Sequence, residues 1–153
     1  MVNKYIGVKI IHAEPMTAER AGKQLGRPID TRNADAKGNG YLVHYEDGYT
    51  SWSPKKQFEE AYRKTDGMTF GLAVEVLKKG LRVARQGWNG KGMYLFLIGV
   101  SGSNDYWTYT NGKNDNYPLL PFISIKTPDD KVVPWVTSQM DVLAEDWTIV
   151  GDK

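Results

Sequence analysis

The sequence predicts an α+β fold, with a small N-terminal hairpin-plus-helix unit followed by an α+β domain that has a twisted, mainly antiparallel sheet and short helices. Two observations support this prediction. Short apolar segments with strand character alternate with short helical patterns along the 153 residues. A turn signal near Thr65-Asp66-Gly67 separates two halves that do not resemble each other in pattern. We therefore expect two domains, residues 1–66 and residues 67–153.

The first unit opens with an apolar segment, Tyr5–Ala13, for which we expect a strand, and continues through a polar stretch at 17–40. The following segment, GYLVHYEDGYTSWSP, is typical of a hairpin. Asp47-Gly48 suits a two-residue turn, because both central positions of such a turn need positive φ. That register pairs residue 45 with 50 and residue 43 with 52. One face, expected to be core, then carries Tyr41, Val43, Tyr45, Thr50 and Trp52.

A short helix is expected after the hairpin. Ser53-Pro54 supplies an N-cap followed by a first-turn proline. Phe58, Ala61 and Tyr62 follow at helical spacing. Gly67 is expected to stop this helix, which places the domain boundary there.

The second domain begins with a helix that Thr69 is expected to cap and Gly80 to end. Strands are expected at Leu81–Arg85, Met93–Val100, Phe122–Lys126, Lys131–Trp135 and Trp147–Val150. The segment MYLFLIGV is apolar at both alternating sets of positions, which predicts a central strand covered on both faces. Pro134 marks its strand as an edge or a bulge. Ser138 and Asp141 have capping-box spacing at the start of a last helix.

Composition excludes several classes of function. The chain has no cysteine, so disulfides and thiolate metal sites are excluded, and its two histidines make a histidine zinc site unexpected. We expect neither a cofactor nor a metal. A formal net charge of +2 gives little reason to expect long nucleic acid as a partner. No apolar run reaches membrane-spanning length, and the N-terminus does not match a signal peptide. A reducing cytoplasm is compatible with this composition.

The segment ARQGWNGKGMYLFL places Trp88 in a glycine-flanked loop ahead of the expected central strand. One interpretation is that Trp88 folds back over the edge of the sheet as a core cover. The other is a ligand site, because Arg85 can pair with phosphate, Asn89 offers a donor and an acceptor, and the glycines let a ligand approach the backbone. Aromatic faces stack on nucleobases, so the second interpretation suits a nucleotide-like molecule.

Charge and aromatic residues mark three further segments. Residues 78–91 carry five basic residues and no acid, whereas 141–152 carry four acids and no base. This indicates either solvated faces or a basic wall for a pyrophosphate or phosphodiester. The polar, aromatic-rich stretch 101–118 is either a functional loop or a hairpin around Asn111-Gly112 that packs on itself. Trp135 precedes a helix start and is either a core anchor or part of an anion site. Trp147 is expected in the core.

No catalytic constellation is expected. The sequence has no cysteine nucleophile, no paired histidines, no metal-binding histidine cluster and no phosphate-loop lysine motif. The neighbouring carboxylates Asp129 and Asp130 follow Pro128 in a turn signal, which favours solvation over acid–base chemistry. We therefore expect a protein that binds its ligand without catalysis.

An ordered set of motifs resembles a known family. The segments are MTFGLAVEVLKKGLRVARQGWNGKGMYLFL, LLPFISIKTPDDKVVPW and SQMDVLAEDWTIV, which span about residues 68–150. Together they resemble the phage-encoded Thoeris anti-defence proteins of the second type. The resemblance implies a non-catalytic sponge in the host cytoplasm. Such a protein binds glycocyclic ADP-ribose made by a TIR-domain defence enzyme, and some relatives also take up cyclic dinucleotides.

The resemblance also implies an assembly and a set of ligand-binding residues. Family members form homotetramers, with ligand pockets where subunits meet. Matched residue by residue, the motifs give an expected ligand-binding set of Arg85, Trp88, Asn89, Met93, Trp135, Ser138, Gln139 and Asp141.

This chain departs from the family pattern in its first 66 residues and in a long, aromatic insert at 101–118. The preferred ligand is therefore open at this point. Two other hypotheses stay beside the sponge. One is a hydrolase of the same signal, and the other is a phage protein-interaction module of the virion or of a host-takeover complex.

Overall fold

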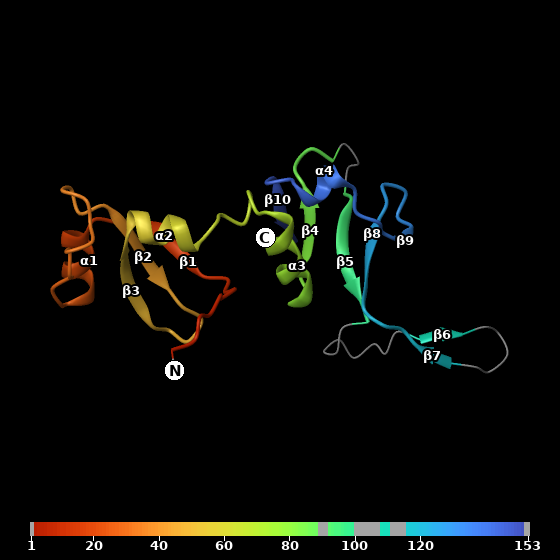
Figure 1. Cartoon of the computed structure of the whole chain (residues 1–153), viewed down its shortest axis with the longest axis horizontal. Helices are drawn as coiled ribbons and strands as arrows, with labels where there is room; N and C mark the ends of the chain where they lie inside the picture. Colours follow the sequence, from red (N-terminus) through yellow and green to blue (C-terminus); the bar gives the residue numbers. More distant parts are fainter. Residues whose placement is uncertain (1, 89–91, 100–107, 111–115, 152–153) are drawn as a thin grey trace. The chain divides into compact units, whose positions relative to one another are not determined.

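The computed structural model describes residues 2–88, 92–99, 108–110 and 116–151. The chain divides into two compact units, Met1–Arg63 and Lys64–Lys153, whose elements are labelled in Figure 1. Both units combine antiparallel strands with short helices, which confirms the predicted α+β class. The division between the units falls three residues before the domain boundary expected from the sequence. Whether each unit folds without the other stays a prediction.

The first unit is a three-stranded antiparallel sheet with two helices. Its strands have the spatial order β1-β2-β3, so that β2 is central. The elements in chain order are β1 (His12–Pro15), α1 (Ala18–Leu25), β2 (Gly40–His44), β3 (Thr50–Pro54) and α2 (Lys55–Ala61).

The two helices of this unit pack on opposite faces of its sheet. Leu42 is fully buried and clusters with Met16 and Ala21 of the α1 side. The neighbouring residue Tyr41 points to the other face, since side chains alternate along a strand, and its ring stacks on Phe58 of α2 at 4.1 Å. The sheet is therefore covered on both sides, and each face of β2 has its own helix.

The hairpin between β2 and β3 forms, but its predicted register is wrong. Leu42 lies opposite Trp52, whereas the sequence-based register placed Val43 there. Among the described residues Asp47 does not have positive φ, while Gly48 does at 85°. A two-residue turn needs positive φ at both positions. The loop therefore has three residues, and the Tyr45 N–H donates to the Tyr49 carbonyl across it.

One residue of register moves side chains to the other face. The five residues expected on one core face are consequently split between two faces, with Tyr41, Val43 and Tyr45 on the α2 side. Trp52 lies on the α1 side, where it packs against the buried cluster, and its indole N–H donates to the Met16 carbonyl at 2.7 Å. Thr50 shares that side.

Two further expectations for the first unit are corrected, and one helix was not predicted. The strand expected at Tyr5–Ala13 begins only at His12, because His12 pairs with His44 and any earlier residue would lie opposite Tyr45, the last residue before the loop, or opposite the loop itself. Helix α1 lies in the polar stretch at 17–40, for which no helix was predicted, and the Thr17 hydroxyl accepts from the Arg20 N–H at its start. Ser53 belongs to β3, so Pro54 itself is the N-cap of α2, which ends at Ala61, before Gly67.

The second unit contains a five-stranded antiparallel sheet, with order β10-β4-β5-β8-β9, and a separate two-stranded hairpin, β6-β7. The five strands predicted from the sequence all form, and two of them have the expected bounds. The elements in chain order are α3 (Phe70–Lys78), β4 (Arg82–Arg85), β5 (Tyr94–Ile98), β6 (Thr108–Thr110), β7 (Asn116–Pro118), β8 (Phe122–Lys126), β9 (Val132–Pro134), α4 (Gln139–Val142) and β10 (Trp147–Val150).

Helix ends in this unit follow the predicted local signals. The Thr69 hydroxyl accepts from the Leu72 N–H at the start of α3, and Gly80 has φ of 81° just beyond its end. Ser138 caps α4, and Asp141 completes the capping box. These signals operate within a few residues, which is why the sequence alone predicts them.

The segment expected to be a central strand is one, but it is not fully buried on both faces. β5 is the third of five strands, and β9 with Pro134 lies at an edge as expected. Helix α3 packs on the face of β5 that carries Leu95, which is fully buried. On the opposite face Tyr94 and Phe96 are only half-buried. A hairpin also forms around the expected position, since Tyr109 pairs with Tyr117, although residues 111–115 lie outside the described residues.

The start of β2 leaves no room for a side chain at Gly40, and this generates a prediction. A Cβ on Gly40 would lie 2.3 Å from both the Ser53 carbonyl oxygen and the Trp52 ring. Overpacking of this kind costs about 1–3 kcal/mol. Gly40→Ala is therefore expected to speed hydrogen exchange of the Trp52 indole N–H about 5- to 150-fold, measured by NMR on the full chain.

The matched control is Gly7→Ala, because nothing lies within 4 Å of a Cβ built there. This variant is expected to exchange at the rate of the unmodified chain. Equal exchange rates for the two variants would contradict the packing of Trp52 against Gly40.

Candidate functional site

Three aromatic side chains from separate segments of the second unit meet around Trp147, the first residue of β10. Its ring centroid lies 5.5 Å from those of Phe70 and Trp88 and 6.1 Å from that of Trp135. Trp135 lies 5.9 Å from Phe70 and 6.4 Å from Trp88. The rings are tilted or edge-on to one another, as aromatic pairs prefer. We call these four residues the aromatic cluster.

The cluster has a buried base and a half-exposed rim. Trp147 is fully buried, as the sequence predicted. Phe70, Trp88 and Trp135 are half-buried. Trp88 and Trp135 thus pack on a core residue and also keep part of their surface open to solvent. Both interpretations drawn from the sequence, core cover and ligand contact, are compatible with this placement.

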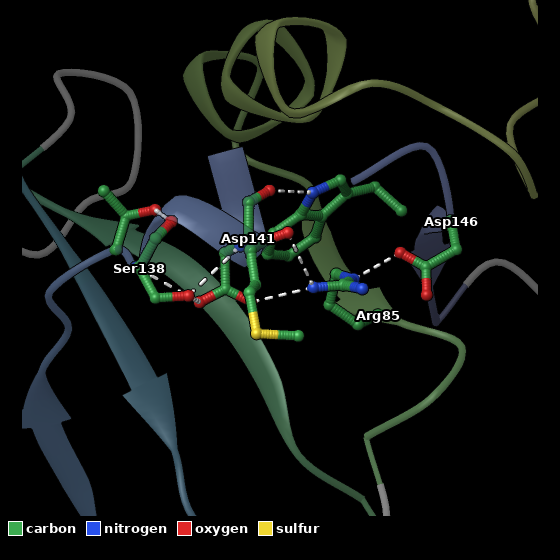
Figure 2. A network of polar contacts seen from close by, with 7 residues as sticks. Arg85, Ser138, Asp141 and Asp146 are labelled. Carbon is green, nitrogen blue, oxygen red and sulfur yellow. Dashed lines mark hydrogen bonds and ion pairs between the residues drawn. The ribbon is translucent and has the colours of Figure 1, made fainter. Parts of the chain in front are cut away.

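Arg85, the last residue of β4, lies at the centre of a polar network beside the cluster (Figure 2). Its Nε donates to the Asp146 carboxylate, and its Nη1 donates to Asp141 Oδ1 at 2.8 Å. Its guanidinium carbon lies 5.7 Å from the centroid of the Trp147 ring. The side chain of Arg85 is 19% exposed and that of Asp141 17%. These charges are therefore largely removed from water and held against the aromatic cluster.

Asp141 connects this network to helix α4 and to the core. Its Oδ2 accepts from the Ser138 hydroxyl at 2.7 Å and from the Ser138 N–H at 3.2 Å. Its backbone carbonyl accepts from the Trp147 indole N–H at 3.1 Å. A single residue thereby fixes the start of α4, the guanidinium of Arg85 and the ring of Trp147. We call Arg85, Ser138, Asp141 and Asp146 the Arg85 network.

The structure brings four of the eight expected site residues into direct contact with the cluster or with one another: Arg85, Trp88, Trp135 and Asp141. Ser138 joins them through the capping box, which already uses its hydroxyl and its N–H. Gln139 is the exposed first residue of α4, and Met93 is a half-buried residue directly before β5. Asn89 lies outside the described residues. Because α4 is a single turn, the expected anion site at its start gains no geometric support.

Sequence reasoning missed two members of this region. Phe70 has no signal of its own beyond its place in the helix that Thr69 was expected to cap, and Asp146 was visible only within the acidic run at 141–152. The signal for Asp146 was present, because an acid-free basic segment and a base-free acidic segment were both visible. Strands β4 and β10 pair antiparallel, with Arg85 opposite Trp147, and this pairing brings the two segments together.

The described residues contain no group of three or more histidine, cysteine, aspartate or glutamate side chains that could hold a metal ion. None of the described helices has the length and apolar character needed to cross a membrane. Two open hollows of about 390 Å³ and about 430 Å³ lie on the first unit, and neither is lined by an expected site residue.

Comparison with known proteins shows which family the second unit resembles. The Tad2-like family model, described as a Thoeris anti-defense 2-like domain, matches residues 68–150. The chain belongs to the Tad2-like family. It is also 50% identical over 85 residues to Thoeris anti-defense 2 of Bacillus phage SP01. The aligned segment covers 55% of this chain and 96% of that protein. The resemblance drawn from the motifs is confirmed.

The Tad2-like match contains the whole of the aromatic cluster and the Arg85 network. It begins at Met68, whose N–H donates to the Trp147 carbonyl and whose carbonyl accepts from the Trp147 N–H. The first unit lies outside the match. The Tad2-like domain of this chain therefore carries every expected site residue that the structure describes.

The Arg85 network makes stability depend on pH. Burial by itself would raise the pKa of Asp141, but hydrogen bonds from the Ser138 hydroxyl and N–H, together with Arg85, outweigh burial and lower it. The hydrogen bond to Asp146, followed by the nearby negative charges, raises the pKa of Arg85 against the opposing effect of burial. A carboxylate with a depressed folded-state pKa stabilises the fold above its unfolded pKa of about 3.9. That contribution is lost as the pH falls through the folded pKa.

We predict that Asp141→Asn lowers the free energy of unfolding by about 1–3 kcal/mol at pH 7, because hydrogen bonds to a charged group are removed. The difference from the unmodified chain should begin to narrow below about pH 4, because Asp141 becomes protonated there in the unfolded chain before it does in the folded protein. Urea unfolding at a series of pH values from 7 to 3 measures both quantities. A difference that stays constant over this range would contradict the role of the Asp141 charge.

Proposed function

We propose that this chain is a phage anti-defence protein that sequesters a cyclic nucleotide immune signal without cleaving it. The proposed ligand is glycocyclic ADP-ribose from TIR-domain Thoeris enzymes, with cyclic dinucleotides as a second ligand class. Membership of the Tad2-like family supports the anti-defence role. The observation within the chain that carries the ligand assignment is the half-exposed aromatic rim formed by Trp88 and Trp135.

The geometry of the rim suits stacking on its outer surface. The rings of Trp88 and Trp135 meet at 59° with their centroids 6.4 Å apart, so no flat slot lies between them. Both rings are half-buried, and the part of each ring that stays open to solvent is proposed to stack on a planar group such as adenine. Gln139 lies exposed at the start of α4, within the same domain, and supplies an amide group for polar contacts to the ligand.

The energetics require more than stacking. A sponge must compete with a sensitive receptor, so we expect nanomolar binding, or about −12 kcal/mol. Two stacking aromatic residues supply roughly 2–6 kcal/mol. The remainder has to come from polar contacts to the phosphates and from a preformed site, which avoids the cost of ordering side chains on binding. The contacts among the aromatic cluster provide such preorganisation.

Assembly is part of the proposal. A unit of 90 residues, Lys64–Lys153, has limited surface with which to enclose a nucleotide. We therefore propose a homotetramer in the host cytoplasm, with the ligand held where subunits meet. We assign the ligand site to the second unit and leave residues 1–66 as a separately folding accessory unit.

The first prediction from this proposal concerns turnover. The full chain is incubated with glycocyclic ADP-ribose, washed, and heated to release what it holds. Mass spectrometry is expected to show the cyclic signal unchanged and in stoichiometric amount. A linear or hydrolysed product would instead favour a hydrolase, and failure to retain any nucleotide would favour a protein-interaction module.

The second prediction concerns the rim. Trp88→Ala and Trp135→Ala are each expected to weaken binding of glycocyclic ADP-ribose more than tenfold in calorimetric titration, since each removes a stacking face worth about 1–3 kcal/mol. Trp135→Phe keeps an aromatic face and is expected to lose less affinity than Trp135→Ala.

Tyr5→Ala is the matched control for the rim variants, because Tyr5 is an aromatic residue of the first unit that is 89% exposed. It should bind as the unmodified chain does. Circular dichroism and urea unfolding check that the tryptophan variants are folded. Normal binding by folded Trp88→Ala and Trp135→Ala would show that both residues serve only to pack the core.

A further inference from the structure

Arg85 matches a basic position of the family motif, and the sequence suggested that it contacts a ligand phosphate. Its surroundings argue for a different role. Two carboxylates, Asp141 and Asp146, contact its guanidinium directly, so one positive charge faces two negative charges. A phosphate brought to Arg85 would meet both carboxylates at close range, and like charges at such distances repel strongly in a partly buried site. The local field at Arg85 therefore opposes an anion.

The bonds of Arg85 instead hold together the segments that carry the proposed ligand contacts. Through Asp141 it reaches the cap of α4, where Ser138 and Gln139 begin the helix. Through Asp146 it reaches the segment before Trp147. The Arg85 carbonyl accepts from the Trp88 N–H at 3.3 Å, and the Asp146 carbonyl accepts from the Gln86 N–H at 3.1 Å. The main chain of the two residues that the ion pair joins thus anchors the start of the loop that bears Trp88.

We infer that Arg85 is a positioning residue that fixes Trp88 and the start of α4 relative to each other, and that it does not contact the phosphates of the ligand. This inference rests on the proposed function. Arg85 acts on binding through the residues that it holds, and Asp141 and Asp146 act with it as one unit. A site whose parts must stay within a fraction of an ångström loses affinity when the supporting residues are loosened.

The two roles predict opposite effects when a carboxylate is neutralised. If Arg85 contacts phosphate, Asp146→Asn removes a competing negative charge and tightens binding. If Arg85 is a positioning residue, Asp146→Asn loosens the guanidinium and weakens binding. Asp146 is the better first variant, because its side chain is 34% exposed and, unlike Asp141, it has no part in the capping box.

The experiment titrates the full chain and its variants with glycocyclic ADP-ribose at several salt concentrations. Asp146→Asn, Arg85→Lys and Arg85→Gln are each expected to weaken binding about tenfold. The salt dependence of the dissociation constant should be the same in Arg85→Gln as in the unmodified chain, because no charge–phosphate contact has been lost. The double variant Arg85→Gln/Asp146→Asn should bind no more weakly than Arg85→Gln, since both residues serve one contact.

Arg82→Gln is the matched control. It removes one positive charge from the same strand at an exposed residue whose guanidinium carbon lies 4.8 Å from the Tyr94 ring centroid, outside the network. This variant should bind as the unmodified chain does. Circular dichroism confirms folding, and Arg85→Lys keeps the test valid if Arg85→Gln does not fold.

Tighter binding by Asp146→Asn, or a smaller salt dependence in Arg85→Gln, would overturn the positioning role and restore a phosphate contact. Those results would leave the proposed function standing. Failure of the unmodified chain to bind the signal would overturn the proposed function itself, and the positioning role with it. The two failures are thus distinguished by whether the unmodified chain binds.

Discussion

The second unit depends on how one large side chain, Trp147, is buried. A tryptophan in a protein interior needs both apolar contacts for its rings and a partner for its indole N–H. Here the rings pack among Phe70, Trp88 and Trp135, and the N–H donates to the carbonyl of Asp141. The backbone of Trp147 bonds in both directions with Met68. Helix α3, the loop after β4, the segment after β9 and helix α4 are all positioned by this residue.

This burial explains why a polar network lies directly beside an apolar core. The Asp141 carbonyl serves Trp147, while its carboxylate serves Arg85 and Ser138. Partly buried charges are costly unless each is paired and hydrogen-bonded. The network meets this condition because Arg85 pairs with two carboxylates and Asp141 also accepts hydrogen bonds from Ser138. Loosening one bond therefore weakens the support of the others, which ties the geometry of the rim to the ion pairs beneath it.

The sequence predicted features that depend on nearby residues. Thr69 caps the start of one helix, the pair Ser138 and Asp141 caps the start of another, and Gly80 follows a helix end. These signals act within a few positions, so their patterns are visible in the chain itself. The predicted hairpin register was wrong because the choice between two and three loop residues depends on the φ angle of Asp47. The pattern of residue types around the turn does not determine that angle. The predicted start of the first strand was wrong because residues before His12 have no partner strand, and the apolar pattern of these residues does not reveal where the partner strand ends.

The candidate site was predictable as a set of residues and not as an arrangement. Trp88 stands out because it lies in a glycine-flanked loop, and Trp135 because it precedes a helix start. Their contact with each other across Trp147 depends on the pairing of β10 with β4, which joins segments about 60 residues apart. The same pairing reverses the expectation for Arg85. Read alone, it is a free cation before a glycine-rich loop, whereas in the fold two acids from the other segment already contact it.

The charge of each unit bears on how an anionic signal would be held. The first unit, Met1–Arg63, has ten basic and eight acidic residues, whereas the second, Lys64–Lys153, has ten of each and is formally neutral. A neutral unit gives little long-range attraction, so capture of the signal would not be accelerated by steering. Tight sequestration would then have to come from slow release, which short-range contacts control. Rings held in place by a buried tryptophan and an ion-pair network meet that requirement, since a preordered site loses little conformational freedom when the ligand binds.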